Sequence, residues 1–278
     1  RSLKADGRRV AIVADSGADL PAAAWDEFGI QMVPLRVTFG SESHLDKVGM
    51  SATGFWAELA RNPAHPKTSQ PPPGDFRRAY ELLSSHFEHV VSVSLTGRLS
   101  GTLQAAQSAA SRVSKPGQLT IGDSKNVSIG MGLVVLAAAE SARAGKSAAE
   151  VVAATERAAA VTRTYGAIPD LSYAVRGGRI PQPWRWLAGI LPLGFLLAID
   201  GPGGIKVRGI LGRRSDRVSA LVRLATQDRL LKSGTTPLRL AIAHSNSPEL
   251  AEALRRACEV AFPNVESILI GDLGPAYG

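Results

Sequence analysis

The sequence predicts an α/β fold of two domains, the first of which contains a doubly wound, mainly parallel sheet. Short apolar segments alternate with helical segments through the first 160 residues, which is typical of a parallel sheet with helices on both faces. The chain has 278 residues, more than one domain usually contains, and 45% of them are apolar, enough for a sizeable core. We therefore expect domains at residues 1–160 and 161–278, the second being a smaller α/β unit.

Each element of the expected first domain has its own local signal. The strands are short apolar runs at residues 9–14, 31–39, 89–94 and 118–122. The helices are expected at residues 21–28, 52–60, 102–113, 128–144 and 147–160. Asp19 is expected to cap the first helix, with Pro21 in its first turn. Ser147 and Glu150 have the spacing of a capping box for the last one.

Strands and helices continue to alternate in the expected second domain, after the domain boundary expected near residue 160. Its strands are expected at residues 165–168, 205–210, 238–243 and 265–270, and its helices at residues 215–231 and 248–261. The apolar stretch at residues 186–199 has two interpretations. It is either a core segment of this domain or a hydrophobic lip that contacts lipid, with Trp184 and Trp186 beside Arg185 as an amphipathic entrance.

Positive charge is concentrated in the second half of the chain. The net charge is +8, and residues 161–229 contain eleven Lys or Arg residues against four Asp residues, which leaves +7 in this quarter. Such a patch can bind nucleic acid, an anionic membrane or an acidic protein partner, and it is also typical of a solvated basic surface. The charge pattern leaves these alternatives open.

Two features favour a cytoplasmic location. The first residues contain no apolar signal core, and the longest strongly apolar run, residues 187–199, is too short to span a membrane as a helix. Cys258 is the only cysteine, so no disulfide can form within the chain. We expect the Cys258 side chain to serve only in packing.

Small polar residues follow three of the predicted strands of the first domain. Ligands of parallel sheets bind beyond the carboxyl ends of the strands, where backbone N–H groups and hydroxyls can approach an oxyanion closely. The candidate ligand residues at these strand ends are Ser16, Thr96, Gly97, Ser100 and Ser124. One such turn alone is ordinary turn chemistry, but three at one edge of a sheet predict a site for an anion.

The most unusual segment is KTSQPPPGDF, at residues 67–76. Its proline run disfavours a helix and a central strand alike, so we expect a stiff extended crossing that leads into a helix starting near Asp75. The segment is either a rigid linker or a rigid support from which Thr68 and Ser69 hydrogen-bond a polar head group. The residues themselves permit both interpretations.

Several motifs follow one another along nearly the whole chain. They are IVADSGADLP at residues 12–21, VPLRVTF at 33–39, TSQPPPGDF at 68–76, LSGTLQAA at 99–106, GDSKNVSIGMG at 122–132, GGRI at 177–180 and Gly274-Pro275. In this order the sequence resembles the DegV family of fatty-acid-binding proteins, which includes the acyl-carrying subunits of the bacterial fatty acid kinase. Each motif alone is weak, whereas the ordered set is specific.

The resemblance implies a long-chain fatty acid in a tunnel between the two domains. Its carboxylate would be bound by the Thr68 hydroxyl and by a hydroxyl just before the LSG turn. Many relatives have two serines at this second position, where this chain has Thr96 and Gly97, so Thr96 is the expected donor and the Gly97 amide its support. Relatives also have a histidine shortly after the last Gly-Pro turn. This sequence ends at Gly278, so we expect a truncated chain or a head-group site without that histidine.

The resemblance further implies that the protein is not itself an enzyme. It would present the fatty-acid carboxylate to a separate kinase that forms the acyl phosphate, and Arg176 and Arg179, which flank a Gly-Gly turn, would dock that kinase. A transient contact with an anionic membrane is a further expectation. Nucleic acid, metal ions and cofactors other than the bound fatty acid are not expected.

Two other functions remain as alternatives. A hydrolase or transferase would use Ser100 or Ser16 as its nucleophile, but the sequence has no GxSxG motif and no histidine in the context of a catalytic base. A nucleic-acid-binding regulator would fit the basic charge, but the sequence lacks aromatic stacking motifs and a recognition-helix signature. P-loop and HExxH motifs are absent from the sequence as well.

Overall fold

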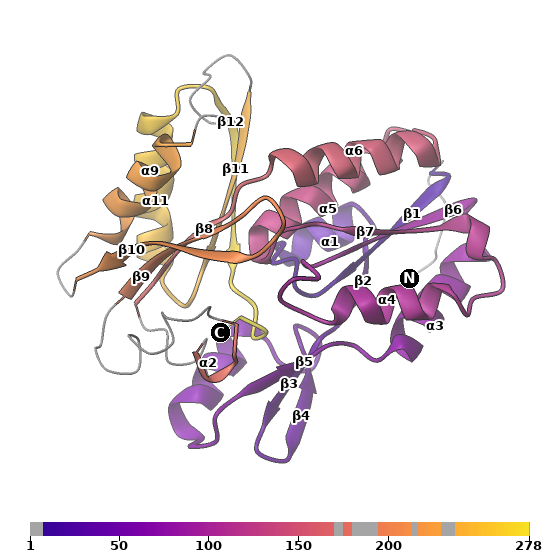
Figure 1. Cartoon of the computed structure of the whole chain (residues 1–278), viewed down its shortest axis with the longest axis horizontal. Coiled ribbons are helices and arrows are strands. Elements are labelled where there is room, and N and C mark those ends of the chain that lie inside the picture. Colours follow the sequence, from indigo (N-terminus) through magenta and orange to yellow (C-terminus); the bar gives the residue numbers. More distant parts are fainter. Residues whose placement is uncertain (1–7, 170–174, 180–193, 213–215, 229–236, 278) are drawn as a thin grey trace.

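The computed structural model describes residues 8–169, 175–179, 194–212, 216–228 and 237–277. These residues form two lobes, one with a parallel sheet and its helices, the other with the strands and helices from β8 onward (Figure 1). The expected α/β class, with a parallel sheet at its core and smaller additional sheets, is confirmed. The lip predicted at Trp184, Arg185 and Trp186 lies outside the described residues.

The first lobe is built on a four-stranded sheet. Its strands are β1 (Val10–Asp15), β2 (Gln31–Val33), β6 (His89–Ser94) and β7 (Leu119–Asp123), and a 3₁₀ turn, η1 (Pro116–Gln118), precedes the last. The order is β2-β1-β6-β7 and all pairs are parallel. β1 is buried along its whole length, which explains its nearly unbroken apolar sequence. Because the pairs are parallel, all four strands end at the same edge.

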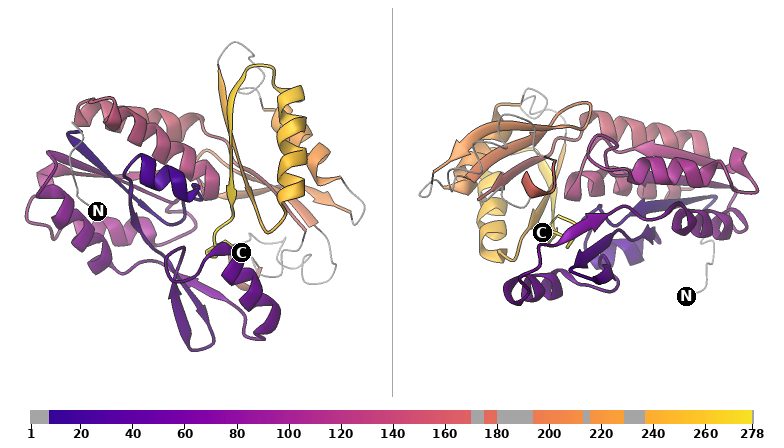
Figure 2. Two further views of the ribbon diagram at one scale, coloured as in Figure 1. Left: turned by 180° about the vertical axis from the view of Figure 1, so that it is seen from behind. Right: turned by 60° about the horizontal axis from the view of Figure 1, so that its bottom comes forward.

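Helices cover both faces of this sheet (Figure 2). On one face lie α1 (Ala22–Glu27), α5 (Ser128–Arg143) and α6 (Ala148–Val161). On the other lie α3 (Pro73–Ser84) and α4 (Thr102–Ala110). Successive side chains of β1 alternate between the two hydrophobic cores, as the period of a strand requires. The doubly wound arrangement predicted for this lobe is therefore confirmed.

The strand expected at residues 31–39 is in fact two strands in different sheets. β2 ends at Val33 in the parallel sheet, whereas β3 (Arg36–Phe39) belongs to a small antiparallel sheet. The break includes Pro34, which has no N–H for a sheet ladder and is disfavoured inside a strand. The prediction of one continuous strand is wrong for this reason.

The small antiparallel sheet packs against one helix of its own. β3 pairs with β4 (Glu42–Leu45) and with β5 (Lys67–Ser69), and α2 (Ala52–Arg61) covers the sheet. The rings of Phe39 and Phe55 meet in this core with centroids 5.6 Å apart. β4 is unexpected from the sequence because its residues, ESHL, do not alternate between polar and apolar.

The second lobe begins with an antiparallel sheet of three strands. β8 (Tyr165–Ile168), β9 (Gly194–Ile199) and β10 (Ile205–Leu211) are arranged in the order β10-β9-β8. Phe195 and Leu197 of β9 are buried at the centre of the lobe. The last part of the apolar stretch is therefore a core strand, in agreement with the first of its two interpretations.

The lobe is completed by a parallel strand pair and two helices. The pair is β11 (Leu238–His244) and β12 (Val265–Asp272), and the helices are α9 (Arg217–Thr226) and α11 (Pro248–Ala261). Cys258 of α11 is buried, as expected for packing. After β12 the chain returns to the first lobe and approaches α2 (Figure 1). None of the helices in the described ranges is long and apolar enough to cross a membrane.

Candidate ligand site at the carboxyl edge of the parallel sheet

The buried carboxylate of Asp15 ties the end of β1 to the end of β6. Its Oδ2 accepts a hydrogen bond from the Leu95 amide at 2.9 Å, and its Oδ1 accepts one from the Gly17 amide at 2.9 Å. Burial raises the pKa of Asp15 to about 7, although these two hydrogen bonds act in the opposite direction. The edge is therefore held together by a group that changes charge near neutral pH.

Ser16 and Ser124, two of the predicted ligand residues, use their hydroxyls inside the protein. Ser16 Oγ donates to Asp46 Oδ2 at 2.6 Å and accepts from the Leu35 amide at 2.9 Å. Ser124 Oγ donates to the Asn126 carbonyl at 3.1 Å and accepts from the Asn126 amide at 3.2 Å. Both serines are fully buried. Because each hydroxyl already has a donor and an acceptor, contact of either with a ligand stays a prediction.

The Thr96 hydroxyl differs from these serines because its proton has no acceptor in the part of the chain that the structure describes. Thr96 Oγ1 accepts a long hydrogen bond of 3.3 Å from the Arg98 amide. The Thr96 amide donates to the Asn126 carbonyl at 3.0 Å, and the residue is fully buried. The Gly97 amide lies 3.4 Å from Asp123 Oδ2, also a long contact. The hydroxyl predicted to donate to a head group is thus free of a competing acceptor among the described residues, and its contact with a ligand stays a prediction.

The segment that leads into α3 lies against the loop after β6. Gln70 packs so closely on Gly101 that a Cβ added to Gly101 would overlap Gln70 Oε1 and lie 2.9 Å from Gln70 Cδ. Two positions earlier, Thr68 is half-buried in β5 opposite Val37 of β3, and Ser69 is exposed. The structure therefore brings the two motifs expected to bind a head group side by side.

An open cavity of about 390 Å³ lies beside the start of α4. Gly97, Ser100 and Arg179 are among its lining residues. Ser100 Oγ lies 2.8 Å from Thr102 Oγ1 at the first turn of the helix. Two predicted ligand residues and one predicted docking residue therefore share one cavity.

The histidines and the possible metal ligands of the described residues bear on the hydrolase alternative and on metal binding. Within these residues, neither Ser16 nor Ser100 is hydrogen-bonded to a histidine. Burial lowers the pKa of His65, and the charges of Arg176 and Lys67 lower it further. Arg176 therefore lies near the loop between α2 and β5 that contains His65. Among the same residues no group of three or more His, Cys, Asp or Glu side chains is placed to hold a metal ion.

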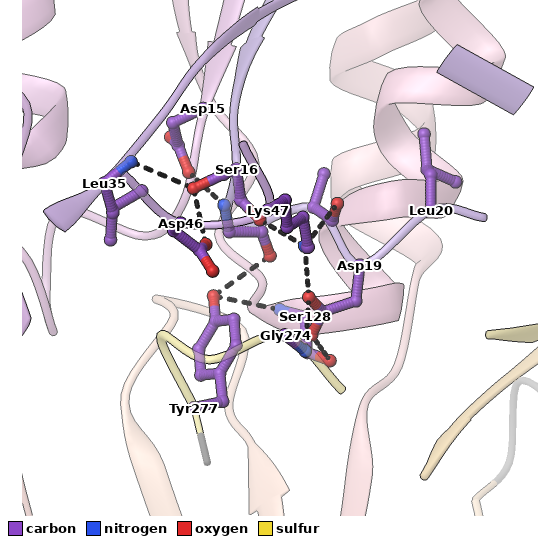
Figure 3. A network of polar contacts seen from close by, with 12 residues as sticks. Asp15, Ser16, Asp19, Leu20, Leu35, Asp46, Lys47, Ser128, Gly274 and Tyr277 are labelled. Carbon is purple, nitrogen blue, oxygen red and sulfur yellow. Dashed lines mark hydrogen bonds and ion pairs between the residues drawn. The ribbon is translucent and has the colours of Figure 1, made fainter. Parts of the chain in front are cut away.

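A buried network links the loop after β1 to the C-terminal segment (Figure 3). The prediction that Asp19 caps α1 is wrong, because Pro21 occupies the N-cap position and no side chain caps the helix. Lys47 Nζ lies instead 2.5 Å from Asp19 Oδ1. Ser128 Oγ and the Gly274 amide donate to the same carboxylate at 2.6 Å and 3.0 Å. An ion pair and two further hydrogen bonds satisfy the buried carboxylate better than a single capping bond would.

Tyr277 completes this network from the C-terminal side, with its hydroxyl pointing toward Ser128 (Figure 3). The hydroxyl donates to the Gly17 carbonyl at 3.1 Å and accepts from the Ser128 amide at 3.1 Å. Burial raises the pKa of Tyr277 well above the ordinary tyrosine value, and the charges of Asp19 and Asp15 raise it further, so the hydroxyl keeps its proton. These partners lie 260 and 149 positions away in the chain, and sequence reasoning missed the pairing.

The comparison with known families covers nearly the whole sequence. The model of the DegV family matches residues 9–278. The chain belongs to the DegV family. A DegV domain-containing protein of Streptomyces coelicolor is 32% identical, with 98% of this chain and 94% of that protein aligned. Protein DegV of Bacillus subtilis is 28% identical, with 92% of this chain and 90% of that protein aligned.

Solved structures of DegV proteins share the fold of this chain. DegV of Bacillus subtilis, a fatty acid binding protein, matches with a TM-score of 0.84 at 26% identity, over 97% of this chain and 94% of that chain. A fatty-acid-binding DegV family protein of Thermus thermophilus matches with a TM-score of 0.82 at 28% identity and the same two coverages. The resemblance to DegV proteins inferred from the ordered motifs is therefore confirmed.

Proposed function

We propose that this chain binds a long-chain fatty acid in a tunnel between its two lobes and holds the carboxylate at the edge of the parallel sheet. Its place in the DegV family, and the fatty acid binding of the two DegV proteins with similar structures, support this class of ligand. The hydroxyls of Thr68 and Thr96 would bind the carboxylate directly. Ser69, Ser100 and the Gly97 amide would surround it.

The observation that carries the proposal is the unused proton of the Thr96 hydroxyl. In the described part of the chain this fully buried hydroxyl accepts one hydrogen bond and donates none. Buried polar groups normally have partners, and a carboxylate is an acceptor that forms short, charge-assisted hydrogen bonds. Ser16 and Ser124 would contribute to the same site by fixing the shape of the edge, with their oxygens as additional contacts.

The acyl tail would supply most of the binding free energy. At about 0.8 kcal/mol for each buried methylene, a tail of about 16 carbons would contribute on the order of 10 kcal/mol before the costs of association and ordering. Each charged hydrogen bond to the carboxylate would add about 1.5–3 kcal/mol. The acyl tail would thus determine the affinity, and the head-group contacts would fix how deeply the fatty acid lies in the tunnel.

We further propose that the protein is a carrier and that a separate kinase phosphorylates the bound carboxylate. Arg179 lines the open cavity next to Ser100, so a cationic side chain lies close to the proposed head-group loop. Together with Arg176, it would attract an acidic surface of the kinase. A transient contact of the basic second domain, from residue 161 onward, with an anionic membrane would supply the fatty acid.

Native mass spectrometry and fatty-acid titration test the binding proposal. We expect the purified protein to carry an additional mass equal to a fatty acid of about 14 to 18 carbons, because a tail of that length gives high affinity. After delipidation, titration with the same fatty acid should restore that mass. A ligand-free spectrum together with no binding in the titration would contradict the proposal.

The Thr68→Ala variant tests the head-group assignment. We expect weaker fatty-acid binding by ~1–2 kcal/mol, because one hydrogen bond to a charged group is lost. Thr38→Ala is the matched control, since Thr38 lies on the neighbouring strand and on the opposite face from Val37, the partner of Thr68. Equal affinities of Thr68→Ala and the wild type would remove Thr68 from the site.

A further inference from the structure

The turn between β9 and β10 is closed tightly around Asp200. The Asp200 amide donates to the Gly204 carbonyl at 2.8 Å, and the Gly203 amide donates to the Asp200 carbonyl at 2.8 Å. The Gly204 amide also donates to Asp200 Oδ1 at 2.6 Å. Gly201 and Pro202 are exposed, whereas Gly203, the next residue, is buried. A well-defined turn therefore directs one glycine into the protein.

Gly203 is buried because it lies against Thr96 of the other lobe. A Cβ added to Gly203 would overlap Thr96 Oγ1 and would lie 2.9 Å from Thr96 Cβ and 3.3 Å from Lys125 Cα. The φ angle of Gly203 is +93°, a conformation that L side chains rarely adopt. Two independent reasons thus favour glycine here. The backbone of the second lobe directly covers the Thr96 hydroxyl.

Thr96 is connected to the second lobe by a second route through Asn126. The Asn126 carbonyl accepts the hydrogen bond from the Thr96 amide at 3.0 Å. Asn126 Oδ1 accepts one from Thr164 Oγ1 at 2.8 Å, just before β8. The Thr164 carbonyl in turn accepts from the Ile199 amide at the end of β9 at 2.9 Å. Both the end of β9 and the turn that follows it are therefore anchored at Thr96.

We propose that the β9–β10 turn is a positioning element for the head-group site, which sets the Thr96 hydroxyl when the two lobes are in contact. This role rests on the proposed fatty-acid function and adds to it that the second lobe positions the Thr96 hydroxyl. Direct packing of the turn on Thr96 Oγ1 restricts where this hydroxyl can lie, and the Thr164–Asn126 bonds hold the same loop. A carboxylate that accepts from Thr96 then binds most tightly to the arrangement with the turn seated, so binding and lobe contact stabilise each other.

The Gly203→Ala variant tests the positioning role. The new methyl group would push the turn off Thr96, so we expect a loss of about tenfold in fatty-acid affinity, as for one charged hydrogen bond. Affinity for the fatty alcohol of the same chain length should change much less, because the alcohol lacks the carboxylate. Gly201→Ala is the matched control, since a Cβ on Gly201 has no heavy atom within 4 Å. It should retain the wild-type acid-to-alcohol affinity ratio.

The affinity ratio separates positioning from a general loss of structure. A variant that is merely less stable would bind acid and alcohol less well in the same proportion. If Gly203→Ala does not fold, Thr164→Val provides the same test, because it removes the hydroxyl that donates to Asn126 and should also lower the ratio. An unchanged ratio in the folded variant would overturn the inference and leave fatty-acid binding intact. A wild-type protein that binds no fatty acid would instead contradict the proposed function.

Discussion

Replacing Lys47 with methionine tests the buried network that joins the C-terminal segment to the sheet edge. Lys47 Nζ lies 2.5 Å from Asp19 Oδ1 and 2.5 Å from the Ser16 carbonyl, and the Lys47 and Asp19 side chains are 17% and 0% exposed. Removing one member of a buried ion pair costs about 3–5 kcal/mol. Ser128 Oγ and the Gly274 amide still donate to Asp19, so we expect the lower end, about 3 kcal/mol.

Protonation of Asp19 should make this destabilisation depend on pH. Burial already raises the pKa of Asp19 despite Lys47, and loss of the cation raises it further. A carboxyl group whose folded pKa exceeds its unfolded pKa stabilises the fold at low pH, and this stabilisation is lost as the pH rises toward the folded pKa. The cost of Lys47→Met should therefore be larger at about pH 8 than at about pH 5.

Urea unfolding followed by circular dichroism measures this cost at both pH values. Adding Asp19→Asn to Lys47→Met should recover stability at the higher pH, because the unpaired charge is removed. Lys146→Met is the control, since Lys146 is exposed and pairs with Glu150 at 3.5 Å, and it should change the free energy of unfolding by less than about 1 kcal/mol. An equal cost of Lys47→Met at both pH values, or a cost as small as that of the control, would refute the reasoning.

Two further substitutions address the same network. Burial raises the pKa of Asp46 to about 6, so the wild type should lose stability as the pH rises from about 4 to about 6, and Asp46→Asn should flatten this part of the curve by roughly 3 kcal/mol. An unchanged slope in urea unfolding across this range would contradict the assignment. Tyr277→Phe leaves the Ser128 amide and the Gly17 carbonyl without the phenol, which should lower the free energy of unfolding by about 1–3 kcal/mol. An unfolding midpoint equal to that of the wild type would show that this hydroxyl does not hold the C-terminal segment.

Features set by local chemistry were predictable from the sequence. The capping box at Ser147 and Glu150 is present, with each side chain bonded to the backbone of the other residue. α5 closes at Gly145, which has a φ of +73° as a helix-ending glycine requires. The alternation of apolar and helical segments predicted the doubly wound lobe, because crossover connections place helices on both faces of a parallel sheet.

Features set by distant partners were not predictable in the same way. Asp19 is of a residue type that often caps helices, and it stands just before α1 in the sequence. Lys47 and Gly274 reach its carboxylate only after the chain has folded. Reasoning from strand ends placed hydroxyl residues at one edge, yet it had no means of separating Ser16, whose hydroxyl donates to Asp46, from Thr96, whose hydroxyl donates to no described residue. That distinction depends on how the loops pack. The resemblance to the DegV family had already singled out Thr96, and the unused proton of its hydroxyl supports the same residue.

A crystal structure with a bound fatty acid of about 16 carbons is the most direct test of the central claim, because a tail of that length should saturate the site. We predict that the carboxylate lies within about 2.5–3.0 Å of the hydroxyl oxygens of Thr68 and Thr96, with the tail between the two lobes. A carboxylate bound away from both threonines, or a space between the lobes that stays empty at saturating fatty acid, would contradict the account.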